Sequence, residues 1–269
     1  MVTQPGWSPP EIDLRQPSAA RVYDCYLGGS HNFEVDRQLA REAIELWPDL
    51  PHIMQANRAF LRRAVRFLVG SGVTQFIDIG SGIPTGGNVH EVAQREDPAS
   101  RVVYVDRDPV AVAHSRAILA GNEHTAVVDA DLRDAGRILG DDAARAMIDF
   151  ERPVAVLLFA VLHFVPDDDD PAAAVAELGT HLVPGSCLVI SHATSDSRPA
   201  LAAALQQLYN RSATPMTMRT AAQVAELFGE FELVPPGLVW LPQWRPDPGE
   251  PVEAEPERMA GYAGVGRKT

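Results

Sequence analysis

From residue 74 onward the sequence alternates between short apolar runs and longer alanine-rich runs. The apolar runs have the composition of strands, and the runs between them have helical composition. The predicted strands are 75–80, 101–106, 124–130, 153–160 and 186–192, and the predicted helices lie near 87–96, 109–120, 134–150 and 171–182. Apolar strands separated by helices are typical of a parallel sheet covered on both faces, so the pattern predicts a doubly wound α/β fold.

The C-terminal part departs from this alternation. Residues 231–244 and 261–268 both have strand composition, and the segment between them is too rich in proline and glutamate for a helix. Two strands joined by a loop predict an antiparallel pair at the sheet edge. The whole pattern therefore predicts a mostly parallel, seven-stranded sheet with an antiparallel last strand.

The N-terminal part has helical periodicity instead. Residues 17–70 carry apolar side chains at helical spacing, and the Gly28-Gly29 pair is expected to end a helix. Residues 1–16 are proline-rich and are expected to be extended. We therefore expect an N-terminal extension and helical cap over 1–70, followed by a Rossmann-like domain over 71–269.

Charge and cysteine content narrow the classes of function. The formal net charge is −13, and the 1–70 segment is neutral, so the excess lies in the rest of the chain. An acidic surface disfavours nucleic-acid and anionic-membrane binding. The apolar stretch Val154–Val165 is too short to span a bilayer, and the first residues lack the pattern of a signal peptide. With two cysteines, Cys25 and Cys187, the sequence predicts reduced thiols in a cytoplasmic protein.

The sequence DIGSG at 78–82 directly follows the first predicted strand. Glycines there permit a tight turn and a close approach of the backbone to a ligand, and Asp78 can accept hydrogen bonds at the carboxyl edge of the sheet. A tight turn without a ligand remains the structural alternative. No Gly-Lys-Ser/Thr follows, which excludes a Walker phosphate-binding loop.

Acidic residues end the next two strands. Asp106 lies where an acid can accept hydrogen bonds from both hydroxyls of a ribose, whereas Asp108, followed by Pro109, has the pattern of a helix N-cap. In the DADL sequence at 129–132, Asp131 and the following backbone N–H could together recognise adenine, with a solvated turn as the alternative.

The exit of the fourth strand and a group of arginines carry further polar residues. His163 is a candidate base, or a residue that merely caps the strand, and the acids at 167–170 are expected to form a solvated turn. No zinc or serine-hydrolase motif occurs, and no metal site is predicted. A further group is expected to form a solvated helix face; its members are Arg58, Arg62, Arg63 and Arg66.

Taken together, the glycine turn and the acids at 106 and 131 resemble those of class I S-adenosylmethionine-dependent methyltransferases. The sequence HLVPGSCLVIS at 181–191 resembles the entry of their fifth strand. Three segments, RVYDCYLGGSHNF, FIDIGSGIPTGGNVHEVAQ and VVYVDRDPVAVAH, more narrowly resemble the bacterial family named S-adenosyl methyltransferase, long catalogued as a domain of unknown function. This resemblance extends from about Pro17 to Lys268.

The resemblance implies S-adenosylmethionine as cofactor and a set of residues that bind it: Asp78, Gly80, Ser81, Gly82, Asp106, Arg107, Asp131, Leu132, Phe159 and Ala160. The glycine turn would pass beside the methionine part. Asp106 would bind the ribose, and Asp131 with Leu132 the adenine. Phe159 and Ala160 would flank the sulfonium. The 17–70 helices would close over the cofactor, with four candidate residues on their inner surface: Tyr23, Tyr26, His31 and Asn32.

The leading hypothesis is methyl transfer to an unidentified, small-molecule acceptor, in which the protein aligns the reactants and excludes water. A general base is needed if the acceptor is protonated, and Tyr23 and His163 are the candidates. One alternative is an NAD-dependent oxidoreductase, although the turn lacks the third glycine of the dinucleotide fingerprint. The other is a non-catalytic sensor that binds the cofactor. The sequence does not predict an oligomeric state.

Overall fold

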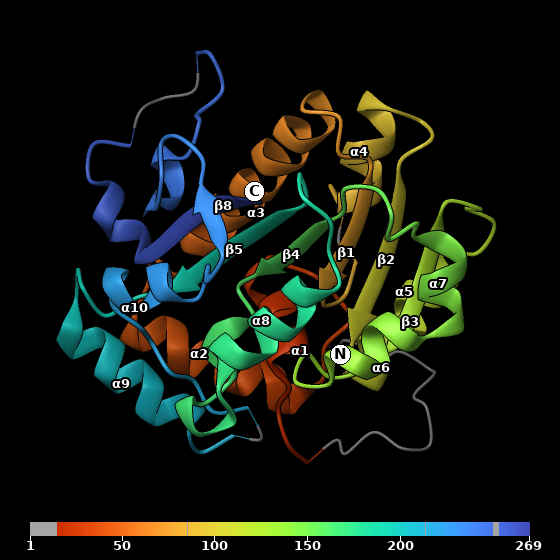
Figure 1. The fold of residues 1–269 in the computed structure, drawn as a ribbon. Helices are drawn as coiled ribbons and strands as arrows, with labels where there is room; N and C mark the ends of the chain where they lie inside the picture. Colours follow the sequence, from red (N-terminus) through yellow and green to blue (C-terminus); the bar gives the residue numbers. More distant parts are fainter. Residues whose placement is uncertain (1–14, 85, 213, 250–252) are drawn as a thin grey trace.

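The structure, a computed structural model, describes residues 15–84, 86–212, 214–249 and 253–269. Its sheet has the strand order β3-β2-β1-β4-β5-β8-β6, and β7 pairs with β8 (Figure 1). The strands are β1 (Gln75–Ile79), β2 (Arg101–Asp106), β3 (Thr125–Asp129), β4 (Ala155–Phe159), β5 (Cys187–Ala193), β6 (Phe231–Leu233), β7 (Val239–Trp240) and β8 (Gly261–Lys268). The first five are parallel and β8 runs antiparallel to β5. The predicted fold class, with its antiparallel last strand, is therefore confirmed.

The sheet differs from the prediction at one edge. The 231–244 segment forms two short strands, β6 and β7, both paired with β8, so the described sheet has eight strands and not seven. The sequence Pro235-Pro236-Gly237 lies between them. Proline has no N–H to donate to a ladder, so a single strand through this segment is disfavoured.

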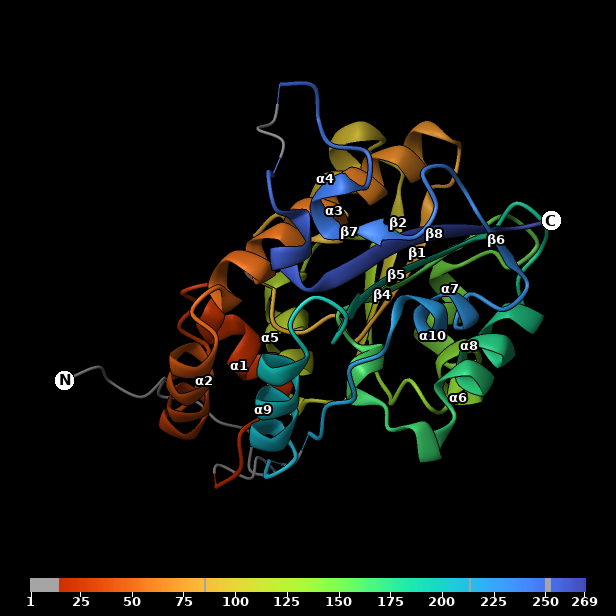
Figure 2. The ribbon, with the colours of Figure 1, turned by 90° about the vertical axis from the view of Figure 1, so that its left-hand side faces the viewer.

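The helices cover both faces and one end of the sheet. They are α1 (Ala19–Tyr26), α2 (Glu34–Leu46), α3 (Leu50–Gly70), α4 (Val89–Glu96), α5 (Pro109–Ile118), α6 (Ala135–Gly140), α7 (Asp142–Met147), α8 (Pro171–Thr180), α9 (Pro199–Tyr209) and α10 (Ala221–Glu226). Figure 2 shows α3 and α4 on one face, α6, α8 and α10 on the other, and α1, α2 and α9 gathered at one end.

Local sequence explains two helix boundaries. Asp108 caps α5 by accepting from the backbone N–H groups of Val110 and Ala111, as predicted. The helix predicted over 134–150 is instead two helices, α6 and α7. Asp141 between them has an extended backbone, and its side chain caps α7. A side-chain cap satisfies backbone donors that have no partner within the helix, which favours a new start there.

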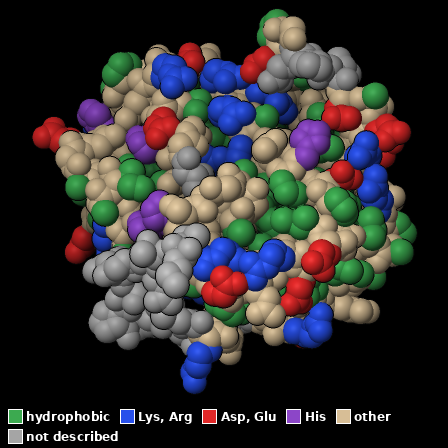
Figure 3. Space-filling model, turned by 180° about the vertical axis from the view of Figure 1, so that it is seen from behind, with side chains coloured by type: hydrophobic (Ala, Val, Ile, Leu, Met, Phe, Trp, Pro, Cys, Tyr) green, Lys and Arg blue, Asp and Glu red, His purple; other side chains and the backbone are tan. Residues whose placement is uncertain are grey.

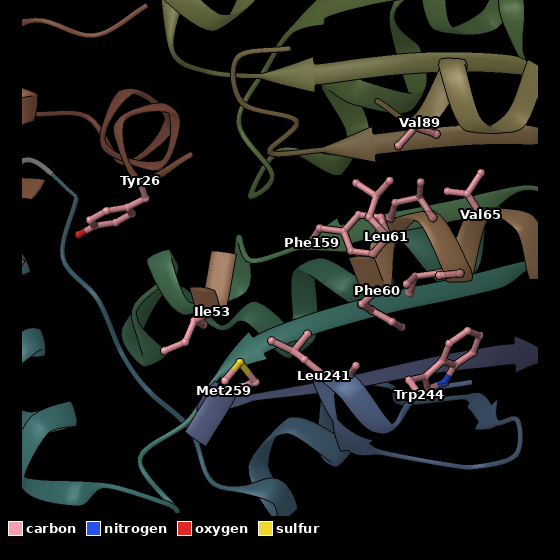
Figure 4. Close-up of a cluster of buried hydrophobic side chains, with 14 of the residues drawn as sticks. Tyr26, Ile53, Phe60, Leu61, Val65, Val89, Phe159, Leu241, Trp244 and Met259 are labelled. Atoms are coloured by element: carbon pink, nitrogen blue, oxygen red, sulfur yellow. The ribbon is translucent and has the colours of Figure 1, made fainter. Parts of the chain in front are cut away.

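Two core clusters lie on opposite faces of the sheet. One combines α2, α3, α4 and α9 with alternate strand residues, and the other combines α6, α8 and α10 with the remaining strand residues. Figure 4 shows Leu61 of α3 beside Phe159 of β4. The Phe60 ring lies between Phe159 and Trp244, with centroids 5.6 Å and 5.3 Å away. The helices α2 and α3 thus share a core with the sheet.

Among the described residues, no helix has the length and apolar character needed to cross a membrane. Cys25 and Cys187 are both free thiols. Figure 3 shows several Lys and Arg side chains close together on the upper part of one face. Residues 1–14, most of the segment predicted to be extended, lie outside the described part of the chain.

Candidate functional site

A cavity of about 490 Å³ opens at the carboxyl ends of β1, β2, β3 and β4. The strand order reverses between β1 and β4, and ligands of open α/β sheets bind at such a reversal. Its wall includes all the residues that were predicted to bind the cofactor: Asp78, Gly80, Ser81, Gly82, Asp106, Arg107, Asp131, Leu132, Phe159 and Ala160. Side chains from α1 and α3 complete the wall. A volume of this size suits a small organic ligand.

The glycine turn brings backbone to the cavity wall. Gly80 has a φ of 72°, and a β-carbon at this position would overlap the Val161 side chain. The amides of Gly80 and Ser81 both donate to the Val105 carbonyl, which fixes the turn against β2. Gly82 has a φ of 65°, and a β-carbon there would meet no atom within 4 Å. The turn therefore needs glycine for its conformation, and at Gly82 it leaves open space.

An unpartnered polar atom lies in this turn. The Ser81 hydroxyl is buried, yet it has no hydrogen-bond partner among the described residues. Buried polar groups are normally hydrogen-bonded, and an orphaned one at a cavity wall is explained when a ligand supplies its partner. The hydroxyl and the open space at Gly82 fit the polar methionine end of S-adenosylmethionine.

Asp106 lies at the end of β2 and is only 8% exposed. One carboxylate oxygen accepts from the Gly82 amide at 2.7 Å and the other from the Asp108 amide at 2.8 Å. Burial raises the pKa of Asp106 to about 6, although these amide hydrogen bonds oppose the rise. A carboxylate has about four acceptor positions, so two remain for ligand hydroxyls. This geometry fits a ribose.

Asp78, near the end of β1, is a second buried carboxyl group in the wall. Desolvation by burial raises its pKa to about 7, and the negative charge of Asp106 adds to this rise. The Arg58 guanidinium opposes it, because a nearby positive charge favours the ionised carboxylate. The cavity thus holds two acids whose ionisation is costly without a positive charge nearby, and S-adenosylmethionine carries such charges.

Asp131 has a different environment. Its carboxylate accepts from Arg107 Nη1 at 2.9 Å and from Arg133 Nη2 at 2.7 Å. The Arg133 Nε and backbone N–H donate to its other oxygen. Hydrogen bonds from Arg133 are the largest cause that lowers the pKa of Asp131. An adenine amino group would therefore have to share this carboxylate with two guanidinium groups.

A chain of hydrogen bonds links the N-terminal helices to the sheet beside the cavity. Asn57 Nδ2 of α3 donates to the Tyr23 hydroxyl at 2.9 Å. The Ser191 hydroxyl donates to Asn57 Oδ1 at 2.6 Å and accepts from the Ala160 amide at 2.9 Å. Sequence reasoning missed Asn57 and Ser191. A polar Asn57 on the apolar face of α3, one turn before Leu61, was a signal that could have identified it.

Most of the remaining predicted site residues lie outside the large cavity. Tyr26 and His163 line a smaller neighbouring cavity. Asn32 is buried and donates to the Asp24 carboxylate at 2.8 Å, and the His31 ring packs against that of His114. Tyr26, His31 and Asn32 are therefore not brought to the inner surface of the large cavity, whereas Tyr23 is.

Of the two candidate bases, His163 is buried and Tyr23 is partly buried. Desolvation lowers the pKa of His163 well below its usual value, and the neighbouring His192 and Arg219 lower it further. The His163 ring Nδ1 lies 3.4 Å from the Ala193 amide that donates to it. Burial raises the pKa of the Tyr23 phenol. Both side chains are therefore neutral at pH 7.

The expectation of a solvated arginine face on α3 is wrong for Arg63. That residue is 6% exposed, and its guanidinium donates to the carbonyls of Leu241 and Trp244 at 2.8 Å and 2.9 Å. Arg58 is partly buried and donates to the Gly86 carbonyl at 2.8 Å. These arginines hold loops against α3, because unpaired loop carbonyls accept strongly from charged donors.

The sequence and the fold are both similar to those of known proteins. The sequence profile described as S-adenosyl methyltransferase matches residues 5–269. The structure is similar to that of a candidate methyltransferase from Thermobifida fusca, with a TM-score of 0.92, 43% identity, and coverage of 98% of this chain and 99% of the other. It is also similar to a protein of the family DUF574 from Streptomyces avermitilis, with a TM-score of 0.91, 39% identity, and coverage of 96% and 99%.

More distant matches show only the fold or cover only a small part of this chain. A protein of an O-methyltransferase family from Burkholderia thailandensis has a TM-score of 0.55 at 14% identity and shares the fold, with coverage of 90% of this chain and 63% of that one. Ribosomal RNA small subunit methyltransferase H of Halorhodospira halophila is 34% identical over 64 residues, which are 24% of this chain and 20% of that relative. The family match over residues 5–269 favours a methyltransferase over an NAD-dependent oxidoreductase, and an enzyme over a non-catalytic sensor. The chain belongs to the S-adenosyl methyltransferase family, and it is a methyltransferase that uses S-adenosylmethionine.

Proposed function

We propose that the protein transfers the methyl group of S-adenosylmethionine to a small-molecule acceptor, with the cofactor bound in the large cavity. The observation that carries this proposal is that the ten residues implied by the resemblance line one cavity at the reversal of strand order. The orphaned Ser81 hydroxyl adds support, because the cofactor offers it a polar partner.

In this arrangement Asp106 accepts from the ribose hydroxyls. Asp131 and Leu132 contact the adenine, and Arg107 positions the Asp131 carboxylate through their ion pair. The glycine turn contacts the methionine part. The buried carboxyl group of Asp78 then ionises more readily, because the cofactor's positive charges offset the cost of burial.

When bound, S-adenosylmethionine supplies a methyl group whose bond to sulfur breaks, leaving the electron pair on sulfur, as an acceptor lone pair forms the new bond. Phe159 and Ala160 at the end of β4 flank the reacting centre. Tyr23 and Asn57 hold α1 and α3 over it and exclude water. Neither Tyr23 nor His163 has a pKa near 7, so we expect neither residue to remove a proton from the acceptor before attack.

We further propose that the 1–70 segment acts as the cap. Supporting this, Arg21 and Tyr23 of α1 and Asn57 of α3 line the cavity opposite the strand ends. Arg21 is anchored by Asp36 at 2.9 Å, which holds α1 against α2.

Calorimetric titration with S-adenosylhomocysteine, the product left after methyl transfer, tests the cofactor site. We expect submillimolar binding to the wild type and a loss of at least about 30-fold for Asp106→Ala, because two hydrogen bonds to a charged group disappear. Asp129→Ala is the matched control, since Asp129 ends the neighbouring strand but is exposed and does not line the cavity. A folded wild-type protein that releases no heat would refute the proposal.

A further inference from the structure

A second cavity of about 60 Å³ adjoins the large one. The two cavities share four lining residues: Ala19, Tyr23, Ala160 and Phe164. The cavities therefore meet at the end of β4. Under the proposed function this junction is where Ala160 flanks the reacting methyl group. A nucleophile in the smaller cavity would therefore approach from the side away from the large one, as in-line transfer requires.

The lining of the smaller cavity is uncharged. Among the residues that the structure describes, the lining includes no Asp, Glu, Lys or Arg side chain. Its titratable groups are one histidine and three tyrosines, and burial lowers the pKa of His163 and raises those of Tyr23, Tyr26 and Tyr209. All four are neutral at pH 7. A charged ligand would lose its hydration here without a counter-charge, which is costly.

One hydrogen-bond donor in this lining has no partner. Trp47 is 1% exposed, and its indole Nε1 is buried without a partner among the described residues. The hydroxyls of Tyr26 and Tyr209, in contrast, are paired with each other at 2.8 Å. Figure 4 shows the Tyr26 hydroxyl pointing away from the cluster around Phe159. A buried indole N–H usually finds an acceptor, and a ligand atom can supply it.

We propose that the smaller cavity is the binding site of the methyl acceptor, and that this acceptor is an uncharged, largely apolar compound with a hydrogen-bond acceptor atom for Trp47 Nε1. This inference rests on the proposed function, because it identifies the acceptor's position from that of the cofactor. The part of the acceptor that enters is limited to about a single ring.

The size limit follows from the volume. A dry apolar cavity of about 150 Å³ holds a benzene ring, and this cavity is smaller, at about 60 Å³. A ring therefore has to extend into the junction or displace part of the wall. Met216 and Met218 form part of that wall, and methionine side chains adapt their shape readily.

Three ring probes at pH 8 test the inference: pyridine, benzene and benzoate. Each is titrated into protein saturated with S-adenosylhomocysteine, so that the large cavity is filled, and binding is followed by saturation-transfer NMR. Pyridine and benzene have similar shapes, but only pyridine has an acceptor atom. We expect both to bind and benzoate to bind at least about 10-fold more weakly, because its charge would be desolvated.

Trp47→Phe removes the indole N–H and keeps an aromatic side chain. We expect this variant to weaken pyridine about five-fold and to change benzene less than two-fold, since one hydrogen bond is lost. Trp244→Phe is the matched control. Trp244 also has a buried, unpartnered Nε1, but it lines neither cavity, so both probes should bind as they do to the wild type.

The outcomes separate the two proposals. If S-adenosylhomocysteine binds but benzoate binds as well as pyridine, the acceptor assignment is wrong and the cofactor assignment stands. Equal losses of pyridine and benzene in Trp47→Phe would also overturn it. If S-adenosylhomocysteine does not bind, the proposed function fails, and the acceptor assignment, which depends on it, fails as well. Should Trp47→Phe not fold, the comparison of benzoate with pyridine in the wild type still decides.

Discussion

Replacing Asp78 with asparagine should stabilise the protein at high pH while weakening its binding of S-adenosylhomocysteine. Asp78 lies on a strand that is buried along its whole length, so its ionised form is poorly solvated. Asparagine has nearly the same shape and carries no charge. The substitution therefore removes the cost of ionising a buried carboxyl group, and it also removes a carboxylate that the cofactor's positive charges would stabilise.

The magnitude follows from the pKa of Asp78, which burial raises from 3.8 to about 7. Because the folded state holds this proton more tightly than the unfolded state, the free energy of unfolding falls as pH rises between these two values. At about 1.4 kcal/mol for each pKa unit, the cost above pH 7 is at most about 4 kcal/mol. At pH 5 it is at most about 2 kcal/mol, and below pH 3.8 it vanishes.

Thermal unfolding of the unliganded wild type and Asp78→Asn at pH 5 and pH 8 measures this difference. Water in the cavity reduces the cost, so we expect a gain of about 2–4 kcal/mol at pH 8 and a smaller gain at pH 5. Each kcal/mol corresponds to a rise in Tm of about 2–4 °C. Asp129→Asn, at an exposed strand end, should leave Tm unchanged. Equal gains at both pH values, or a loss at pH 8, would refute the reasoning.

Two further substitution pairs test the backbone and the buried charge. Gly80→Ala should destabilise the fold by more than about 1–2 kcal/mol, because residue 80 has a positive φ and its new β-carbon would overlap the Val161 side chain. Gly82→Ala should be more stable than Gly80→Ala, since its β-carbon would enter open space, but it should bind S-adenosylhomocysteine more weakly. Equal stability of the two variants in thermal unfolding would contradict this. Arg63→Met should lower the free energy of unfolding by about 2–4 kcal/mol in urea titrations, because two buried loop carbonyls lose their charged donor. Arg66→Met should lower it by less than about 1 kcal/mol, because it removes only the partly exposed ion pair with Asp247.

The strands and their ends were predictable because each strand is a short apolar run bounded by polar residues. Once a doubly wound sheet is predicted, its topology brings the carboxyl ends of β1, β2, β3 and β4 to one edge. That is why residues distant in the sequence, such as Gly80, Asp106 and Ala160, line one cavity. The break at 235–237 was visible as prolines, whereas the break at Asp141 depended on a capping side chain within a helical composition.

Residues fixed by packing between distant elements could not be predicted in this way. Arg63 was predicted to be solvated because it clusters with other arginines on one helix in a segment of neutral net charge, but the 241–244 segment covers it in the fold. Asn57 and Ser191 meet across 134 positions of sequence, through a hydrogen bond between α3 and β5. Periodicity within one helix identifies a buried face; it does not identify the partner that covers that face.

The pKa values of the two candidate bases could not be predicted from the sequence either. A base is useful near pH 7 when its pKa lies close to that value, and sequence position alone gives each group its ordinary pKa. Burial moves the pKa of the Tyr23 phenol up and that of the His163 imidazole down, so both move away from neutrality. Burial therefore leaves neither of these two residues suited to take a proton from the acceptor at pH 7. We therefore expect an acceptor whose attacking atom already carries a free lone pair, without first losing a proton.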